Sequence, residues 1–286
     1  MATELKKTGD FLLKSKHHDR PFIADACYKE TGSKKPCIIF VHGFKGFKDW
    51  GFWNLLAETF ASQDFVFIKL NLSHNGTTPE HPVDFADLEA FSENTFSIEL
   101  DDIGILIDTL ENGNLPLPET EIDSKNIHLI GHSRGGGLVL LKGAEDERVL
   151  TVTAWAPIHN LKERWPQEVL DQWKKDGIFY IDNSRTKQKM PLKYKLVEDV
   201  LNNEDRLNIP RAVQRMDRPI LMIHGTKDET LEYSHTVQLA KLSPYVQLEI
   251  IEDGTHSFGG KHPYAATDLP DHAKKVLDLT LNFLRA

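Results

Sequence analysis

The chain has 286 residues, of which 43 are acidic and 34 basic, so its formal net charge is −9. Its hydrophobic content of 40% and charged content of 27% are ordinary for a globular protein and exclude a disordered, collagen-like or coiled-coil chain. The longest apolar runs are far shorter than the ~20 residues that span a bilayer. The acidic balance also argues against a dedicated nucleic-acid-binding protein. A soluble enzyme or a soluble binding protein remains.

The two cysteines, Cys27 and Cys37, are too few for a disulfide framework, and we expect both to be reduced strand residues. The segment from Met1 to Lys16 has no extended apolar stretch and no cleavage-site pattern, so we expect no signal peptide and a cytoplasmic protein. No metal-binding motif such as His-Glu-x-x-His or Cys-x-x-Cys occurs, and we expect neither a metal nor a cofactor. The sequence does not predict the oligomeric state.

Apolar runs alternate with helical patterns along the chain, which is typical of βαβ units around a mainly parallel sheet. The run at 37–41 is apolar throughout, as expected of a strand that is buried on both faces. The patterns predict strands at 11–16, 22–28, 37–41, 65–70, 126–130, 149–156, 220–224 and 246–251, and helices at 53–62, 98–110, 137–144 and 272–284.

The alternation stops between the strands predicted at 149–156 and 220–224. The intervening segment is polar, carries scattered aromatic residues and is too long for a simple crossover. We therefore expect residues 158–216 to form an inserted lid subdomain, and residues 1–157 and 217–286 to form one catalytic domain.

The most informative motif is Gly-His-Ser-Arg-Gly at 131–135, which follows a predicted strand and precedes a predicted helix. This is the context of a nucleophile elbow, in which a strained turn exposes the hydroxyl of Ser133. Gly131 and Gly135 lack the bulk that would keep strand and helix apart. A structural glycine-rich turn or a phosphate loop is the alternative. However, no Gly-Lys-[Ser/Thr] follows, and the glycine spacing does not fit a dinucleotide fingerprint.

A serine nucleophile needs a histidine base that an acidic side chain orients. Asp228 follows the strand predicted at 220–224, and His256 follows the strand predicted at 246–251. Because the carboxyl ends of parallel strands gather at one edge of a sheet, we expect both residues to meet Ser133 there. A helix-capping role is the structural alternative for Asp228.

Several neighbouring residues compete with these candidates. Glu229 and Asp253 are the rivals for the acid. Three more histidines follow strands. The side chain of His132 is expected to point away from the serine hydroxyl, and His42 and His224 are expected to brace loops through hydrogen bonds.

The tetrahedral intermediate of acyl transfer also needs an oxyanion hole. The backbone N–H of Arg134, directly after the serine, is the expected first donor. The second is the backbone N–H of Phe44, in the His-Gly-Phe-Lys-Gly loop at 42–46. A tight turn would explain Gly43 but not the second glycine, Gly46.

Together these motifs resemble those of the α/β-hydrolase superfamily. The resemblance runs from about Pro21 to the C-terminus, and four motifs carry it: His-Gly-Phe at 42–44, Gly-His-Ser-Arg-Gly-Gly at 131–136, Asp228 after a strand and Gly-Thr-His at 254–256. It implies an α/β fold with a mainly parallel central sheet flanked by helices. The inserted segment resembles the small lid of cinnamoyl (feruloyl) esterases, and the chain also resembles the catalytic domain of prolyl-oligopeptidase-type peptidases.

The resemblance implies a serine hydrolase that cleaves a small-molecule carboxylic ester through an acyl-enzyme on Ser133. The expected pocket walls are aromatic and would suit a cinnamoyl- or feruloyl-type ester. They are Trp155 at the sheet end, and Trp165, Trp173, Phe179 and Tyr180 in the insertion. The alternative is that the four residues of the insertion form its own small core.

Two other functions remain open. A serine aminopeptidase or prolyl-oligopeptidase-like peptidase would need acidic residues for a substrate amine, and the insertion contains Glu163, Glu168 and Asp171. A non-catalytic receptor that uses the same fold is the alternative from another class. Dehalogenases and epoxide hydrolases are disfavoured because they need a carboxylate where Ser133 stands.

Overall fold

Alternating burial along the strands gives the central sheet two apolar faces. In β4 (Lys35–Val41), Cys37, Ile39 and Val41 contact one hydrophobic core, whereas Ile38 and Phe40 contact the other. This two-residue period is that of a strand covered on both sides. The structure is a computed structural model that describes residues 4–162 and 165–286.

Within the described residues, nine strands form one sheet in the order β1-β3-β5-β4-β6-β7-β10-β11, and β2 pairs with β3. Within this sheet, β5, β4, β6, β7, β10 and β11 run parallel to one another, and β3 is antiparallel to β5. The bounds are β1 Leu5–Lys7, β2 Phe11–Lys14, β3 Pro21–Lys29, β5 Val66–Leu70, β6 Ile122–His132, β7 Val149–Trp155, β10 Ile220–Gly225 and β11 Val246–Ile251. The predicted mainly parallel sheet is confirmed.

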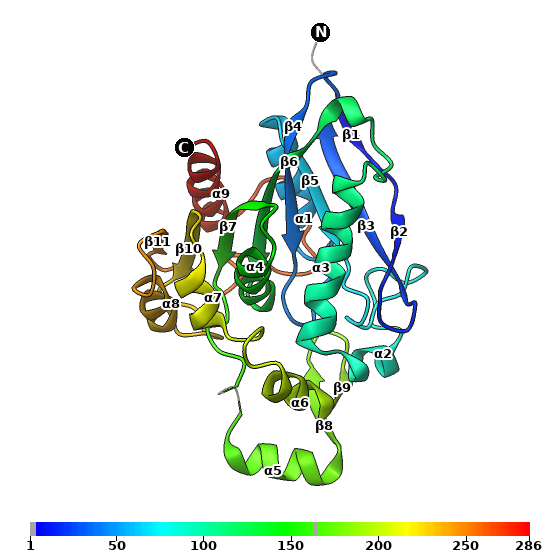
Figure 1. The fold of residues 1–286 in the computed structure, drawn as a ribbon, viewed down its shortest axis with the longest axis vertical. Helices are drawn as coiled ribbons and strands as arrows, with labels where there is room; N and C mark the ends of the chain where they lie inside the picture. Colours follow the sequence, from blue (N-terminus) through cyan, green and yellow to red (C-terminus); the bar gives the residue numbers. More distant parts are fainter. Residues whose placement is uncertain (1–3, 163–164) are drawn as a thin grey trace.

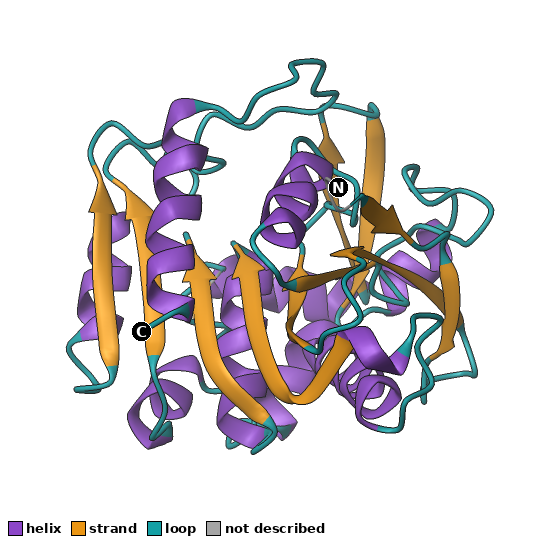
Figure 2. Cartoon of the chain, turned by 90° about the horizontal axis from the view of Figure 1, so that it is seen from above, coloured by secondary structure: helices purple, strands orange, loops and turns teal. Residues whose placement is uncertain are grey.

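Helices cover both faces of the sheet, as Figure 2 shows. On one face lie α1 (Trp53–Ser62) and α9 (Asp271–Leu284). The other face is covered by α3 (Phe96–Glu111), α4 (Arg134–Glu145), α7 (Ile209–Arg215) and α8 (Tyr233–Ala240). No helix within the described ranges is both long and apolar enough to cross a membrane.

The segment between β7 and β10 contains α5 (Gln167–Asp176), a hairpin of β8 (Ile178–Asn183) and β9 (Gln188–Lys193), α6 (Lys195–Asn202) and α7. In Figure 1, α5, the hairpin and α6 lie together at one end of the molecule, beyond the sheet. The helix α7 packs against α4, and buried residues of α5, β9 and α6 belong to the same hydrophobic core.

Polar contacts tie this segment to the chain around α2 (Leu88–Glu93). Lys193 and Lys195 pair with Glu93 at the end of α2. The Oγ of Ser97 donates to Asp199 of α6 at 2.6 Å. The inserted segment is thus held against the body at several points.

Element positions follow the sequence patterns closely where those patterns are regular. The helix predicted at 53–62 has those bounds in the structure. The helix predicted to begin at 137 begins at Arg134, because glycines at 135–137 hide its periodicity. The sequence patterns did not predict β1, α2 or α8, which are short. Cys27 and Cys37 are buried and free.

Candidate active site

The chain turns sharply from β6 into α4 at Ser133, whose backbone has φ 57° and ψ −116°. A non-glycine residue rarely adopts such angles, and surrounding structure must hold it there. The N–H of Ser133 donates to the carbonyl of Trp155 in β7 at 2.8 Å, and its carbonyl accepts from Gly137 in α4 at 3.2 Å. The strained turn is therefore fixed on both sides.

The two elbow glycines lie where no methyl group fits. A Cβ on Gly135 would lie 2.2 Å from the carbonyl oxygen of Val41 and 2.6 Å from that of His42. A Cβ on Gly131 would lie 2.2 Å from the carbonyl oxygen of Gly135. The first turn of α4 consequently packs directly on the ends of β4 and β6.

Asp228 and His256 lie in the loops that follow β10 and β11, and they meet. The Nδ1–H of His256 donates to Oδ2 of Asp228 at 2.7 Å, and the Asp228 side chain has no exposed surface. The other carboxylate oxygen, Oδ1, accepts the backbone N–H groups of Thr230 and Leu231 at 2.8 Å each. With Nδ1 engaged in this way, Nε2 of His256 is the nitrogen left to accept a proton.

A neighbouring histidine holds the same carboxylate. His224 donates through Nε2 to Oδ2 of Asp228 at 2.8 Å, and its Nδ1 accepts from Thr236 at 2.7 Å. Burial acts to raise the pKa of Asp228, but the hydrogen bonds from His224 and His256 outweigh it and keep that pKa well below its usual range. Asp228 is therefore ionised at any working pH.

The rival acids do not take this place. Glu229 accepts the backbone N–H of His256 at 3.3 Å, but not the imidazole. Asp253 pairs with Lys227 at 2.7 Å on the surface, where both side chains are largely exposed.

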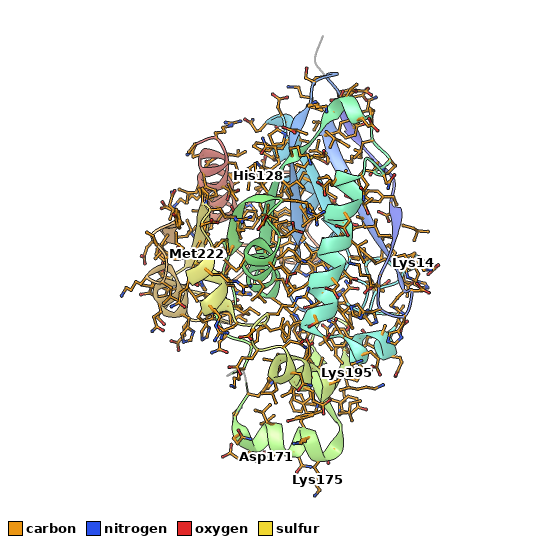
Figure 3. All side chains as sticks on the ribbon, in the orientation of Figure 1. Lys14, His128, Asp171, Lys175, Lys195 and Met222 are labelled. Atoms are coloured by element: carbon orange, nitrogen blue, oxygen red, sulfur yellow. The ribbon has the colours of Figure 1, made fainter. Side chains whose placement is uncertain are left out.

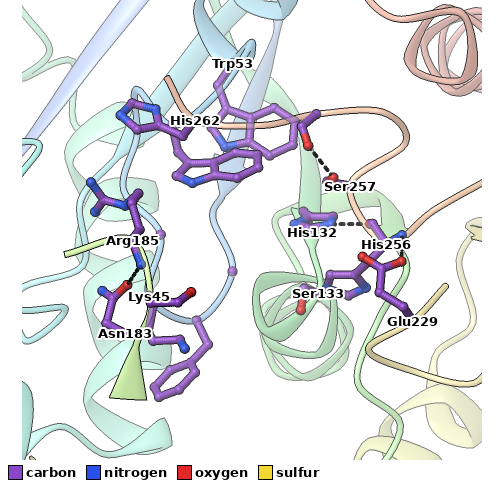
Figure 4. A pocket seen from close by; sticks show the side chains of 16 residues that line it. Lys45, Trp53, His132, Ser133, Asn183, Arg185, Glu229, His256, Ser257 and His262 are labelled. Atoms are coloured by element: carbon purple, nitrogen blue, oxygen red, sulfur yellow. Dashed lines mark hydrogen bonds between the residues drawn. The ribbon is translucent and has the colours of Figure 1, made fainter. Parts of the chain in front are cut away.

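Ser133 and His256 border one cavity of about 380 Å³, and Figure 4 shows their side chains side by side. The rest of the lining comes from the loop after β4, the start of α1, the end of β6, the turn of the β8–β9 hairpin and the loops after β10 and β11. These residues are Gly43, Phe44, Lys45, Gly46, Trp50, Trp53, His132, Asn183, Ser184, Arg185, Glu229, Ser257, Gly260 and His262. The inserted segment thus contributes directly to the cavity.

The loop after β4 runs beside the elbow, since a Cβ on Gly43 would lie 3.1 Å from the Cβ of Ser133. In the described part of the chain, the N–H groups of Phe44 and Arg134 are not taken by other groups of the protein. Both are next to Ser133 in space or in sequence, as an oxyanion hole requires.

The side chain of Arg134 links the two residues that carry these amides. Its Nε donates to Glu99 of α3 at 2.8 Å, and both side chains are buried. Its guanidinium lies 5.1 Å from the ring centre of Phe44 and 4.2 Å from that of Phe96. The sequence did not predict this ion pair, because no local pattern connects Arg134 with a glutamate 35 positions away.

The other histidines act mainly as braces. His42 donates through Nδ1 to the carbonyl of Gly43 at 2.8 Å and braces the loop after β4. His224 braces the loop after β10 through its bond to Asp228, so both histidines act as expected. His132 braces the histidine loop in the same way: it borders the cavity, and its Nε2 donates to the carbonyl of His256 at 2.8 Å.

The predicted pocket walls are also corrected. Trp155 is 1% exposed and donates to Thr280 in the core beneath α9. Trp173, also buried, packs against Trp165 and Phe179. The residues predicted as pocket walls do not border the cavity: Trp155, Trp165, Trp173, Phe179 and Tyr180, of which Tyr180 is 55% exposed.

The aromatic residues of the inserted segment mainly pack within it, and the cavity's aromatic walls come from residues outside 158–216. They are Phe44, Trp50 and Trp53, with His262 beside them. The sequence predicts Trp53 only as the first residue of the helix at 53–62, because composition alone does not distinguish a ring in the core from a ring at a cavity.

The comparisons with known proteins agree with this architecture. Residues 38–267 match the model of the alpha/beta hydrolase family. The chain belongs to this family. A search of curated proteins gave no match. Among the described residues, no group of three or more His, Cys, Asp or Glu side chains is arranged to hold a metal ion.

Solved structures share the fold at low sequence identity. Est1E from Butyrivibrio proteoclasticus superposes with a TM-score of 0.67 at 17% identity, covering 98% of this chain and 100% of that one. Ferulic acid is bound to Est1E in a second structure, with a TM-score of 0.66 at 18% identity and coverage of 99% and 95%. The acylaminoacyl peptidase of Pyrococcus horikoshii has a TM-score of 0.65 at 16% identity, covering 98% of this chain and 42% of that one.

Replacement of Gly135 by alanine tests the packing of the elbow. Helix propensity alone would make Gly→Ala stabilising by about 1 kcal/mol. The contacts with Val41 and His42 reverse the sign, and we expect a loss of about 1–3 kcal/mol in the free energy of unfolding. Gly104→Ala in α3 is the control, because only the flexible end of Lys142 lies near it. Urea denaturation of both variants measures the difference, and a stabilised Gly135→Ala protein would contradict the packing account.

Buried neutral histidines predict acid sensitivity. Burial lowers the pKa of His42, His74 and His128 to about 4 and that of His132 to about 3. Below the ordinary value of 6.5 the unfolded chain therefore binds more protons at these four sites, and the free energy of unfolding falls as the pH drops from 6.5 towards 4. Asp102 makes a smaller contribution of the opposite sign to this pH dependence, because burial raises the pKa of its carboxyl group to about 6.

Each such histidine contributes a slope of up to about 1.4 kcal/mol per pH unit. We expect His128→Gln to flatten the dependence by about one proton in urea denaturation between pH 7 and 4.5. His81→Gln, at an exposed position, is expected to leave the slope unchanged. Equal slopes for the wild type and His128→Gln would overturn the assignment.

Proposed function

We propose that this α/β hydrolase cleaves carboxylic esters through an acyl-enzyme on Ser133. One observation carries the proposal: the serine at the strained elbow shares a cavity with His256, and His256 is hydrogen-bonded to the buried carboxylate of Asp228. A serine hydroxyl is a weak nucleophile until a base of this kind takes its proton.

In this mechanism Ser133 Oγ attacks the ester carbonyl while Nε2 of His256 takes the hydroxyl proton. Asp228 holds the imidazole in the required tautomer and stabilises the imidazolium. The backbone N–H groups of Phe44 and Arg134 bind the oxyanion. The imidazolium then protonates the leaving alkoxide, and a water molecule, activated by the same histidine, hydrolyses the acyl-enzyme.

The lining of the cavity favours an ester with an aromatic group. Trp50 and Phe44 offer ring surfaces in the cavity that Ser133 borders, and the ring of the buried Trp53 packs against that of Trp50. The presence of ferulic acid in the Est1E structure supports a related substrate on this fold. We also propose that residues 158–216 form a lid unit on a catalytic domain of 1–157 and 217–286, because the turn at Asn183–Arg185 reaches the cavity.

An amide substrate is less well supported. Glu168 and Asp171, considered as partners of a substrate amine, lie on α5 and do not border the cavity. Figure 3 places Asp171 at the outer end of the inserted segment. Glu163 lies outside the described residues.

The test is a substrate panel on the wild type and on Ser133→Ala. It combines p-nitrophenyl acetate and butyrate, methyl ferulate and aminoacyl-p-nitroanilides. We expect ester turnover in the wild type and a loss on the order of 10⁶ in Ser133→Ala, since the nucleophile is removed. Ser257→Ala is the control, because this serine borders the same cavity but donates to the carbonyl of Gly260.

Other outcomes distinguish the alternatives. Turnover of the anilides alone would replace the esterase by a peptidase. Full ester hydrolysis in Ser133→Ala would end the proposal, and a wild-type protein inactive on the whole panel would favour a receptor.

A further inference from the structure

One side of the active-site cavity carries positive charge that no acidic side chain of the described residues neutralises. Arg185, in the turn between β8 and β9, and Lys45, in the loop after β4, both line the cavity. Among the described residues, no carboxylate pairs with either side chain. Lys48, three residues after Lys45, shows the contrast, because it pairs with Asp25 and Asp49.

Buried rings of the body hold the guanidinium of Arg185 at the cavity. It lies 5.3 Å from the ring centre of Phe47 and 5.5 Å from that of Phe85. Such cation–π contacts position the charge without neutralising it. Figure 4 shows Arg185 extending towards His262 on the side of the cavity opposite Glu229.

The turn that carries Arg185 is fixed as well. The backbone N–H of Arg185 donates to Oδ1 of Asn183 at 3.2 Å. The side chain of Gln188, in the same hairpin, donates to the carbonyl of Phe85 at 3.0 Å. Lys45 reaches across to the hairpin and donates to the carbonyl of Asp182 at 3.1 Å. The hairpin and the oxyanion loop are thereby joined at the cationic side.

Further hydrogen-bond donors gather here. Since Oδ1 of Asn183 is taken by Arg185, its Nδ2 is the free end. This Nδ2 is buried without an acceptor in the described chain. His262 accepts the N–H of Gly51 at Nδ1, so the proton of the neutral ring is on Nε2. Burial and the nearby Arg185 charge both lower the pKa of His262 and favour that neutral ring.

The single carboxylate among the described lining residues, Glu229, lies at the other side, where it accepts the N–H of His256. The cavity is therefore polarised, with an acidic group beside the triad and two unpaired cations across from it. A guanidinium with free N–H groups matches the geometry of a carboxylate.

We propose that the substrate is an ester that carries a carboxylate, which binds to Arg185 at the hairpin side of the cavity while Ser133 attacks the ester carbonyl. Lys45 adds to the positive potential. This inference rests on the proposed esterase function and specifies its substrate class. The carboxylate belongs either to the acyl part or to the alcohol part of the ester, and the experiment separates the two.

Two matched pairs of esters test the proposal. Mono-p-nitrophenyl adipate and p-nitrophenyl hexanoate differ by a carboxylate on the acyl side. Similarly, 4-acetoxybenzoate and p-tolyl acetate differ by a carboxylate on the alcohol side. The measured quantity is the ratio of kcat/KM for the charged ester to that for the neutral ester, after subtraction of the rate with Ser133→Ala.

We expect the wild type to favour the charged ester in one pair, and that pair identifies the side. Arg185→Gln should lower the ratio about tenfold, as expected for one solvent-accessible charge-assisted contact. Lys189→Gln is the matched control, because it removes one charge from the same hairpin at an exposed position outside the cavity, and it should keep the wild-type ratio. No preference in either pair, or an unchanged ratio in Arg185→Gln, would overturn the proposal.

Two further measurements keep the outcome decisive. If Arg185→Gln does not fold, the wild-type ratio is measured at 20 mM and 500 mM salt. The higher salt should screen the exposed cation and lower the ratio, and a constant ratio would contradict the proposal. Calorimetric binding of monomethyl adipate and methyl hexanoate to Ser133→Ala tests the anion site without catalysis. Tighter binding of the adipate together with no Ser133-dependent hydrolysis would reject the esterase and keep the anion site. Hydrolysis of esters without any preference for charge would do the reverse.

Discussion

The contact between the first turn of α4 and the end of β4 determines the rest of the site. Because Gly135 has no side chain, α4 begins almost on the carbonyl oxygens of Val41 and His42. That approach puts the strained turn at Ser133 beside the loop that starts at Gly43. The proposed nucleophile and the proposed oxyanion donor Phe44 follow strands that are far apart in the sequence, and this packing brings them together.

A layer of buried polar side chains then fixes each group in place. His42 braces the loop after β4, His224 binds the carboxylate of Asp228, and His132 binds the backbone carbonyl of His256. Arg134, paired with Glu99, carries one of the proposed donor amides and contacts the ring of Phe44, which carries the other. Since a buried polar group is costly unless it is hydrogen-bonded, these partners leave the site little freedom to rearrange.

The parts of the structure that local sequence patterns specify were predictable. A continuous apolar run marks β4, and Gly-x-Ser-x-Gly between a strand and a helix marks the elbow at Ser133. Asp228 and His256 were identified because each directly follows a strand of a parallel sheet. These residues, which the structure brings together, are the ones whose position depends on chain topology more than on side-chain packing.

Features made by distant side chains were not predictable in the same way. The clamp of Arg134 by Glu99 and the placement of Arg185 over Phe47 depend on contacts between elements that no spacing rule connects. The aromatic residues of the insertion illustrate the same limit. Composition predicted them as pocket walls, yet Trp173 is buried within the insertion and the walls are formed by Trp50 and Trp53.

The central claim is that Ser133 is the activated nucleophile. Mass spectrometry of the protein after treatment with a fluorophosphonate tests it most directly, because this reagent forms a stable adduct only with a serine that a base activates. The account predicts one adduct per chain, on the peptide that contains Ser133, and no adduct on Ser257. Absence of labelling in the folded protein, or an adduct on another residue, would contradict it.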